Sequence, residues 1–276
     1  MALGMRFGIQ LPCSTINDDV LRIIRGKGFE GVELLIGEDE GGLSDLMFTT
    51  VKIKAQGLNI LLHAPFLTIN IASLNRAIRR KSINRILRLL EAAGLMGCSI
   101  ITIHPGCAIP MPRLLPFLLR GFERSLIIGS LKEVARKAEE VGVDIGIENM
   151  PTLKLWDLDC YTPCDNPEDL ISLISNVNSP RLKVTLDVGH AATTGGVSLF
   201  VEKLADYIVN VHLGYKHTPK YFERKDNSIS YFKESLKSLR RAGYKGMLII
   251  EVNDLNEAFK LKESIESLRR AESEVT

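Results

Sequence analysis

The sequence predicts a single α/β domain, a (β/α)₈ barrel, across residues 1–276. The length of 276 residues is normal for one barrel of this kind. Short apolar runs alternate with longer segments of helical period, and eight such units favour a parallel sheet closed into a barrel. The runs are apolar at consecutive positions, as expected when both faces of each strand are buried.

The eight predicted strands are rich in β-branched and other apolar residues. They are Arg6–Leu11, Gly31–Ile36, Ile60–Phe66, Ser99–His104, Val143–Met150, Leu182–His190, Tyr207–Leu213 and Gly246–Asn253. An open doubly wound sheet is the alternative, and it normally carries a glycine-rich phosphate-binding turn after an early strand. The sequence has no such turn, which favours the barrel.

Helices are predicted between these strands. Their ranges are Asp18–Lys27, Leu43–Gln56, Leu74–Met96, Arg113–Val141, Pro167–Asn176, Ser198–Asp206, Ser230–Ala242 and Leu255–Glu272. Several of them end next to a glycine, which adopts the left-handed conformation that stops a helix at little steric cost. These glycines are Gly28, Gly57, Gly97, Gly142 and Gly243. No linker or second domain is evident, so we expect one domain.

The composition is that of a globular protein with a full core, with 45% hydrophobic and 25% charged residues. The net charge of +2 neither demands nor excludes a polyanionic partner. No apolar run reaches the roughly 18 residues that span a bilayer, and no signal peptide is evident, so we expect a cytoplasmic protein without membrane partners. Five scattered cysteines do not form a disulfide pattern, and Cys160 and Cys164 are interpreted as ordinary thiols.

Ionisable residues end the last six predicted strands. They are His63, His104, Glu148, Asp187 with His190 close behind, His212 and Glu251. The active site of such a barrel lies at the carboxyl ends of its strands, so we expect these side chains to converge at one rim. Each of them alone could be structural, because a strand-end histidine is often only hydrogen-bonded and a glutamate can cap a helix. Their joint arrival at one rim indicates a functional site, and therefore an enzyme.

A divalent metal is the physical reason to gather these groups. Buried carboxylates repel one another, and a cation removes that repulsion. Carboxylate and imidazole ligands together suit Mn²⁺, Co²⁺, Zn²⁺ or Fe²⁺ better than Mg²⁺. We assign one metal to Glu148, Asp187, His212 and Glu251. His63 and His104 could hold a second metal with Glu148 as a bridge, or bind substrate hydroxyls. Glu33 is either a pocket residue or a member of an ion pair.

The ordered set of strand-end residues resembles the xylose-isomerase-like barrel superfamily, from about Arg6 to Asn253. The resemblance to its sugar isomerases and epimerases implies one metal on the four ligands above and a substrate contact from His190. The stretch 187–190, Asp-Val-Gly-His, is more similar to this branch. It implies isomerisation or epimerisation of a sugar, polyol or sugar phosphate. Glu148 and Glu251 would be the general base and acid, and the proton transfer would pass through an enediolate stabilised by the metal.

Endonuclease IV is the alternative branch, with zinc-dependent cleavage of DNA at abasic sites. Phe66 and Leu67 after His63, and the turn from His104 to Gly106, are similar to it. The resemblance implies a third zinc on His190, Asp226 and a further histidine, but Ser228 stands at that last position. Three-metal hydrolysis is therefore in doubt, whereas a two-metal site is not.

Basic residues near the predicted rim bear on the substrate. The segment 75–88 is rich in arginine, and the loop 215–225 is basic and aromatic and contains Lys216, a candidate substrate-binding residue. Such residues could grip a nucleic-acid backbone, bind a sugar phosphate or close over a small substrate. They could equally form a solvated helix face and a loop.

Overall fold

A computed structural model describes residues 4–38, 43–107, 111–112, 117–155, 158–214, 225–252 and 254–273 of the chain. Eight parallel strands close into a barrel in the order β1-β11-β10-β9-β6-β4-β3-β2, and β2 pairs with β1. The strands are β1 (Arg6–Pro12), β2 (Gly31–Leu35), β3 (Asn59–His63), β4 (Ile100–Ile103), β6 (Asp144–Glu148), β9 (Leu182–Asp187), β10 (Ile208–Gly214) and β11 (Met247–Glu251). The (β/α)₈ fold is therefore confirmed.

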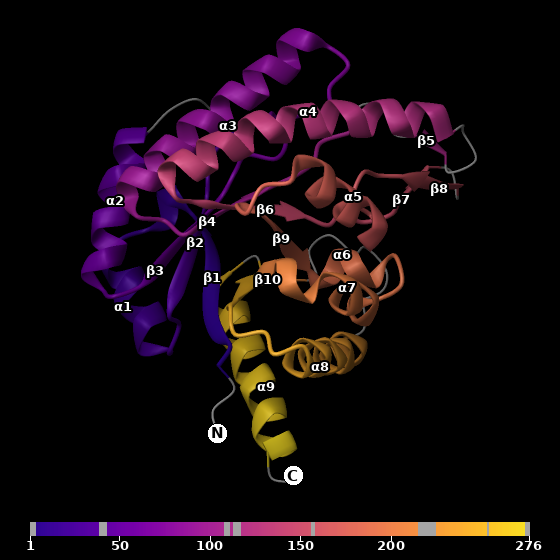
Figure 1. Ribbon diagram of the computed structural model, residues 1–276. Coiled ribbons are helices and arrows are strands. Elements are labelled where there is room, and N and C mark those ends of the chain that lie inside the picture. Colours follow the sequence, from indigo (N-terminus) through magenta and orange to yellow (C-terminus); the bar gives the residue numbers. More distant parts are fainter. Residues whose placement is uncertain are drawn as a thin grey trace.

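Helices surround the strands on the outside of the barrel (Figure 1). They are α1 (Asp18–Gly26), α2 (Leu43–Ala55), α3 (Arg76–Met96), α4 (Phe117–Val141), α5 (Pro167–Val177), α6 (Val188–Ala192), α7 (Val197–Leu204), α8 (Lys225–Arg241) and α9 (Leu255–Ser273), with the 3₁₀ turns η1 (Cys13–Thr15) and η2 (Ala205–Tyr207). The five glycines predicted to end helices all have φ between +62° and +77°. Among the described residues, no helix is both long and apolar enough to cross a membrane.

The fold differs from the prediction in several places, and strand β3, for example, ends at His63 and not at Phe66. Strand β9 ends at Asp187 and not at His190, because the Asp187 side chain accepts the His190 N–H and starts the short helix α6. Helix α8 begins at Lys225, five residues before the predicted start at Ser230. A small antiparallel sheet of β5 (Met111–Pro112), β8 (Leu158–Tyr161) and β7 (Leu153–Leu155) was not predicted. Its strands are too short to show a period in the sequence.

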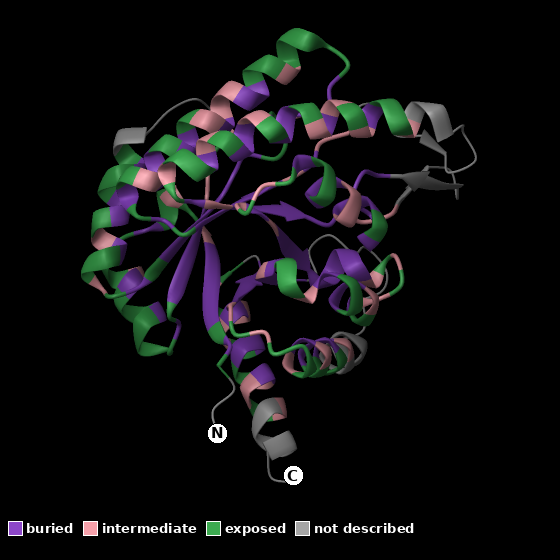
Figure 2. Cartoon of the chain, in the orientation of Figure 1, coloured by how far each residue is buried: buried purple, intermediate pink, exposed green. Residues whose placement is uncertain are grey.

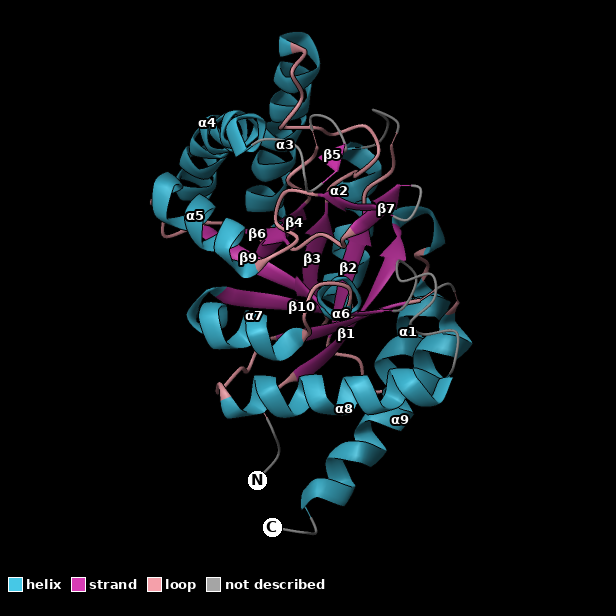
Figure 3. Cartoon of the chain, turned by 90° about the vertical axis from the view of Figure 1, so that its right-hand side faces the viewer, coloured by secondary structure: helices cyan, strands magenta, loops and turns pink. Residues whose placement is uncertain are grey.

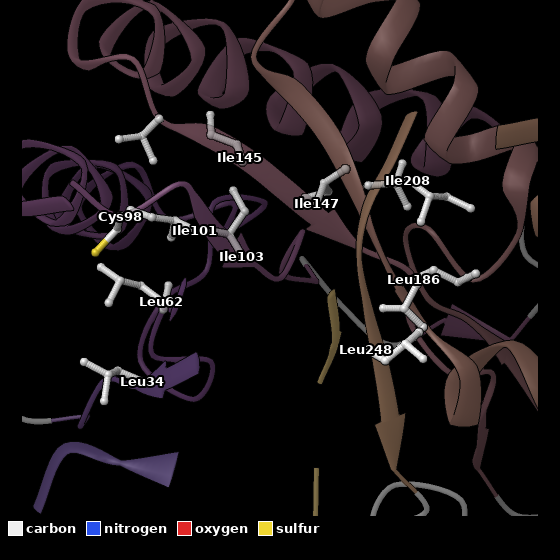
Figure 4. Close-up of a cluster of buried hydrophobic side chains, with 14 of the residues drawn as sticks. Leu34, Leu62, Cys98, Ile101, Ile103, Ile145, Ile147, Leu186, Ile208 and Leu248 are labelled. Atoms are coloured by element: carbon white, nitrogen blue, oxygen red, sulfur yellow. The ribbon is translucent and has the colours of Figure 1, made fainter. Parts of the chain in front are cut away.

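The core lies mainly between the strands and the helices. Barrel strands are almost wholly buried, whereas the helices alternate between buried and exposed residues (Figure 2). The large apolar cluster includes outward-facing strand residues such as Leu62, Ile101 and Ile147 (Figure 4). A separate cluster contains Leu61 of β3 and Ile249 of β11. Side chains alternate between the two faces of a strand, so this second cluster fills the inside of the barrel.

The helices lie around the strand bundle when it is viewed from the side as well (Figure 3). The carboxyl ends of all eight strands open at one end of the barrel, because every neighbouring pair is parallel. Residues that end different strands therefore share one rim, and a site can form there from parts of the chain far apart in sequence.

Candidate metal centre

The strand period aims the ionisable side chains into the barrel. His63 lies two residues after the inward-facing Leu61, and Glu251 lies two residues after Ile249. Alternate residues of a strand share one face, so both side chains point inward at the rim. His63, Glu148, Asp187, His190, His212 and Glu251 are all buried, and His104 is partly buried.

Glu148 lies among four imidazole rings. Its Oε2 is 3.3 Å from Nε2 of His63 and 3.1 Å from Nε2 of His104. Its Oε1 is 3.3 Å from Nδ1 of His190 and 3.7 Å from Nδ1 of His212. Burial alone would raise the pKa of Glu148, but the charge and hydrogen bond of His104, with further contributions from His212 and His63, hold it well below its ordinary value. Glu148 is therefore a carboxylate at neutral pH.

Asp187, His212 and Glu251 form a second part of the same centre. One potential ligand atom of each lies within 4.8 Å of the others. Nδ1 of His212 is 3.6 Å from Oε2 of Glu251. Burial raises the pKa of Asp187, and the negative charges of Glu148 and Glu251 raise it further. The crowding of these carboxylates is the repulsion that a cation would relieve.

The donors fit a divalent metal ion. Nδ1 of His212 is buried and has no hydrogen-bond partner among the described residues. The carboxylate oxygens of Glu148 and Glu251 face it from 3.7 and 3.6 Å, which is too far for a hydrogen bond. Two ligands of one metal lie about 3–3.5 Å apart, because each is about 2.1 Å from the ion. The distances from His212 Nδ1 to the two carboxylate oxygens are slightly longer than those between two ligands of a bound metal.

A second group of potential ligands adjoins the first. His63, His104 and Glu148 bring one ligand atom each within 4.8 Å of one another. Nδ1 of His63 lies 2.8 Å from the carbonyl oxygen of Ala64. A carbonyl oxygen only accepts hydrogen bonds, so Nδ1 carries a hydrogen. Burial lowers the pKa of His63, but the hydrogen bond and the charge of Glu148 at Nε2 raise it above its ordinary value. His190 has a similar contact, from Nδ1 to the carbonyl oxygen of Asn149 at 2.8 Å.

A cavity of about 180 Å³ opens beside these groups. Its lining residues are Gln10, Leu35, His63, Phe66, His104, Glu148 and Glu251. The ring of Phe66 lies 5.5 Å from that of His104 and 6.1 Å from that of His63, measured between centroids. Part of the wall is thus aromatic, formed by Phe66 beside the rings of His63 and His104. A small polar molecule with one apolar face suits such a lining.

The structure brings together seven of the candidate site residues named from the sequence. His63, His104, Glu148, Asp187, His190, His212 and Glu251 converge at the rim. Lys216 lies outside the described residues, and the side chains of Asp226 and Ser228, in the first turn of α8, are also not described. Glu33 takes the second of its two predicted roles, since its Oε2 lies 2.9 Å from Nε2 of His212.

Some residues of the site were not predicted. Gln10 and Phe66 line the cavity, and Asn210 contacts both Glu33 and His212. A polar residue inside an apolar strand is a usable signal for two of them, because Gln10 lies in β1 and Asn210 in β10. Phe66 was noted only as part of the resemblance to endonuclease IV, and an aromatic residue after a strand does not by itself indicate a cavity wall.

A parallel barrel with histidines and carboxylates gathered at the carboxyl ends of its strands defines the class of this protein. The chain belongs to the xylose isomerase-like TIM barrel family, whose model matches residues 21–271. The uncharacterized protein MJ1311 of Methanocaldococcus jannaschii is 30% identical over 216 residues, which are 75% of this chain and 68% of that protein.

Solved structures similar to this chain include sugar epimerases. A D-tagatose 3-epimerase-like protein has a TM-score of 0.80 and 27% identity, covering 99% of this chain and 100% of that one. The 3-keto-D-glucoside 4-epimerase of E. coli has a TM-score of 0.73 and 18% identity, covering 96% and 99%. The second likeness shows the shared fold alone.

Proposed function

We propose that this protein is a divalent-metal-dependent epimerase or isomerase that acts on a small sugar, polyol or sugar phosphate. The observation that carries the proposal is that carboxylate oxygens of Glu148 and Glu251 lie 3.7 and 3.6 Å from His212 Nδ1, and that both residues line one small cavity. The likeness to a D-tagatose 3-epimerase-like protein at 27% identity supports it. The buried carboxylates and imidazoles are the donors that such a metal prefers.

Glu148, Asp187, His212 and Glu251 would hold the metal, with Mn²⁺, Co²⁺ or Zn²⁺ as candidates. A bound divalent cation supplies Lewis acidity, which makes the C–H bond next to a sugar carbonyl or hydroxyl easier to deprotonate. His63 and His104 would either bind a second ion with Glu148 or donate hydrogen bonds to substrate hydroxyls. Either role suits their position in the cavity wall.

Two carboxylates in one cavity can move a proton from one face of a substrate carbon to the other. Glu148 is ionised at neutral pH and its Oε atoms can accept a proton, while Glu251 faces the same cavity and can return one from another direction. His190 would bind the substrate, as the sequence resemblance implies. Phe66, which is exposed at the mouth of the cavity wall, would cover an apolar sugar face, and the buried lining residues would exclude water from the reacting carbon.

Hydrolysis of DNA at abasic sites is the second candidate. The group of His63, His104 and Glu148 favours it, because two neighbouring metal ions suit phosphodiester cleavage. Ser228 in place of the third-zinc histidine counts against it. The two candidates differ in substrate and in the number of ions, so one preparation can be assayed for both.

Exchange of a substrate C–H hydrogen with solvent tests the proposal. The metal-loaded protein is incubated in D₂O with a panel of ketoses, aldoses, inositols and sugar phosphates, and deuterium uptake is followed by NMR. We expect uptake with at least one sugar, its loss on chelation, and a loss of at least 100-fold in Glu251→Gln. Asp144→Asn is the matched control, since Asp144 pairs with Arg181 at the start of β6.

Two results would contradict the proposal. One is the absence of deuterium uptake across the whole panel with metal-loaded protein. The other is full activity of Glu251→Gln, which would remove the role of that carboxylate. Nicking of an abasic duplex by the same preparation, with strong salt dependence, would favour the second candidate instead.

A further inference from the structure

Glu33 is a completely buried carboxylate inside the barrel. Oε1 accepts hydrogen bonds from Oγ1 of Thr102 at 3.1 Å and Nδ2 of Asn210 at 3.0 Å. Oε2 accepts from Nε2 of Gln10 at 3.1 Å and lies 2.9 Å from Nε2 of His212. Two donors meet each oxygen, so the carboxylate is held in one orientation.

This network fixes which nitrogen of His212 faces the candidate metal centre. A carboxylate that accepts only requires a hydrogen on Nε2 of His212. The other nitrogen, Nδ1, faces Glu148 and Glu251 at 3.7 and 3.6 Å, and it is the one that gives up its hydrogen when the ring binds a metal. Within the described part of the chain Nδ1 has no hydrogen-bond partner, so nothing there competes with a metal for it.

The neighbours of Glu33 are built around this arrangement. Thr102 continues the network to Oγ1 of Thr185 at 2.9 Å. Gly146 has no side chain and so leaves space for Thr185, because a Cβ at this position would lie 2.1 Å from Thr185 Oγ1. A buried charge pair stabilises a fold little compared with well-packed apolar residues of similar size. Stability therefore gives no reason to place a carboxylate here, whereas orientation of His212 does.

We propose that Glu33 is a positioning residue for the metal centre: it holds the imidazole of His212 with Nε2 protonated and Nδ1 aimed at the ion. The proposal rests on the metal centre of the proposed function and adds a residue outside its ligands. A histidine ligand whose other nitrogen donates to a carboxylate is fixed in orientation and is a more basic ligand. Loss of such a partner weakens metal binding about 10–100-fold.

Metal binding without substrate tests this role. Full-length protein is stripped of metal and titrated with Co²⁺ alone by calorimetry and visible absorption. We expect Glu33→Gln to bind Co²⁺ about 10–100-fold more weakly than wild type. Glu33→Asp, which retains the negative charge, should recover part of that loss and also covers the case in which Glu33→Gln does not fold. Asp144→Asn makes the same carboxylate-to-amide change at the opposite end of β6, so its affinity should be unchanged.

The outcomes separate this role from the proposed function. Wild-type affinity in a folded Glu33→Gln variant would overturn the positioning role while leaving the metal centre in place. Equal weakening in Asp144→Asn, or no recovery in Glu33→Asp, would also overturn it, because the effect would then be one of general stability or packing. A wild-type protein that binds no Co²⁺, Mn²⁺ or Zn²⁺ would instead remove the proposed function itself.

Discussion

The pKa values of two buried carboxylates of the same centre are shifted in opposite directions. The imidazoles of His104, His212 and His63 hold the pKa of Glu148 well below its ordinary value against the effect of burial. Burial raises the pKa of Asp187, and the negative charges of Glu148 and Glu251 raise it further. Groups whose surroundings push their pKa values apart are typical of sites that carry out acid–base chemistry.

The cysteine thiols give a prediction at the scale of single residues. Burial raises the pKa of Cys13 to about 11 from a value of 9.0, which lowers the thiolate fraction about 100-fold at pH 8. We expect iodoacetamide to modify Cys13 in the native protein about 100-fold more slowly than in urea, as measured by mass spectrometry of the peptide. Equal rates in both states would contradict this, and a rate that climbs about tenfold per unit from pH 8 to 10 would support it.

At the scale of elements, the loop after β3 is tied to the loop after β2. The carboxylate of Glu38 accepts hydrogen bonds from the backbone N–H groups of Phe66, Leu67 and Thr68, at donor–acceptor distances of 3.0–3.1 Å. Arg85 of α3 donates to the carbonyl oxygens of Gly37 and Glu38. This clamp holds the segment that places Phe66 in the cavity wall, so cavity shape depends on contacts outside the cavity.

Removal of the clamp should cost stability. Three N–H groups lose their acceptor in Glu38→Ala, and we expect a loss of about 1–2 kcal/mol in the free energy of unfolding, measured with urea. Glu133→Ala is the control, because Glu133 forms a surface ion pair with Arg80, and such pairs contribute about 0–1 kcal/mol. A loss in Glu38→Ala no greater than in the control would refute the clamp.

The same clamp gives a pH dependence with a definite sign. Burial opposes ionisation of Glu38, but its hydrogen bonds from Thr68, Leu67 and Phe66 outweigh this, and its pKa lies below the ordinary 4.5. A lowered carboxyl pKa stabilises the folded state fully above pH 4.5, and that contribution is lost as pH falls through the folded-state value. The stability difference between wild type and Glu38→Ala should therefore shrink in urea titrations below pH 4.5.

For the whole molecule, the candidate metal centre joins distant parts of the barrel. Its carboxylates and imidazoles come from strands β3, β6, β9, β10 and β11, from the residue after β4 and from α6. The carboxylates repel one another unless a cation is present. A ligand that binds only the folded state stabilises it, by about 2.7 kcal/mol at 100 times its dissociation constant. A bound metal ion should therefore stabilise the folded barrel by joining the strands at this rim.

Thermal unfolding measures this stabilisation by metal. For a chain of this size about 2–4 °C in Tm corresponds to each kcal/mol, so saturating Mn²⁺, Co²⁺ or Zn²⁺ should raise Tm by about 5–10 °C over EDTA-treated protein. Asp187→Asn loses a candidate ligand and should lose most of that shift. A Tm unaffected by all three metals would contradict the stabilisation of the rim by metal.

The architecture and most of the candidate site could be predicted from the amino-acid sequence. Apolar periodicity and helix-ending glycines are local properties, so the eight barrel strands and the long helices between them could be predicted from neighbouring residues, whereas the short helix α6 could not. The alternation of strand faces, with the rule that barrel sites lie at the carboxyl ends, was enough to select His63, Glu148, Asp187, His212 and Glu251.

Only the tertiary structure decided how these groups face one another. Glu33 and Asn210 are 177 residues apart in sequence, yet a hydrogen bond joins them, and their spacing determines the orientation of His212. The position of Phe66 in the cavity depends on Glu38 in another loop. Such contacts depend on strand register and barrel closure, which no local stretch encodes, because they arise only when distant segments pack together.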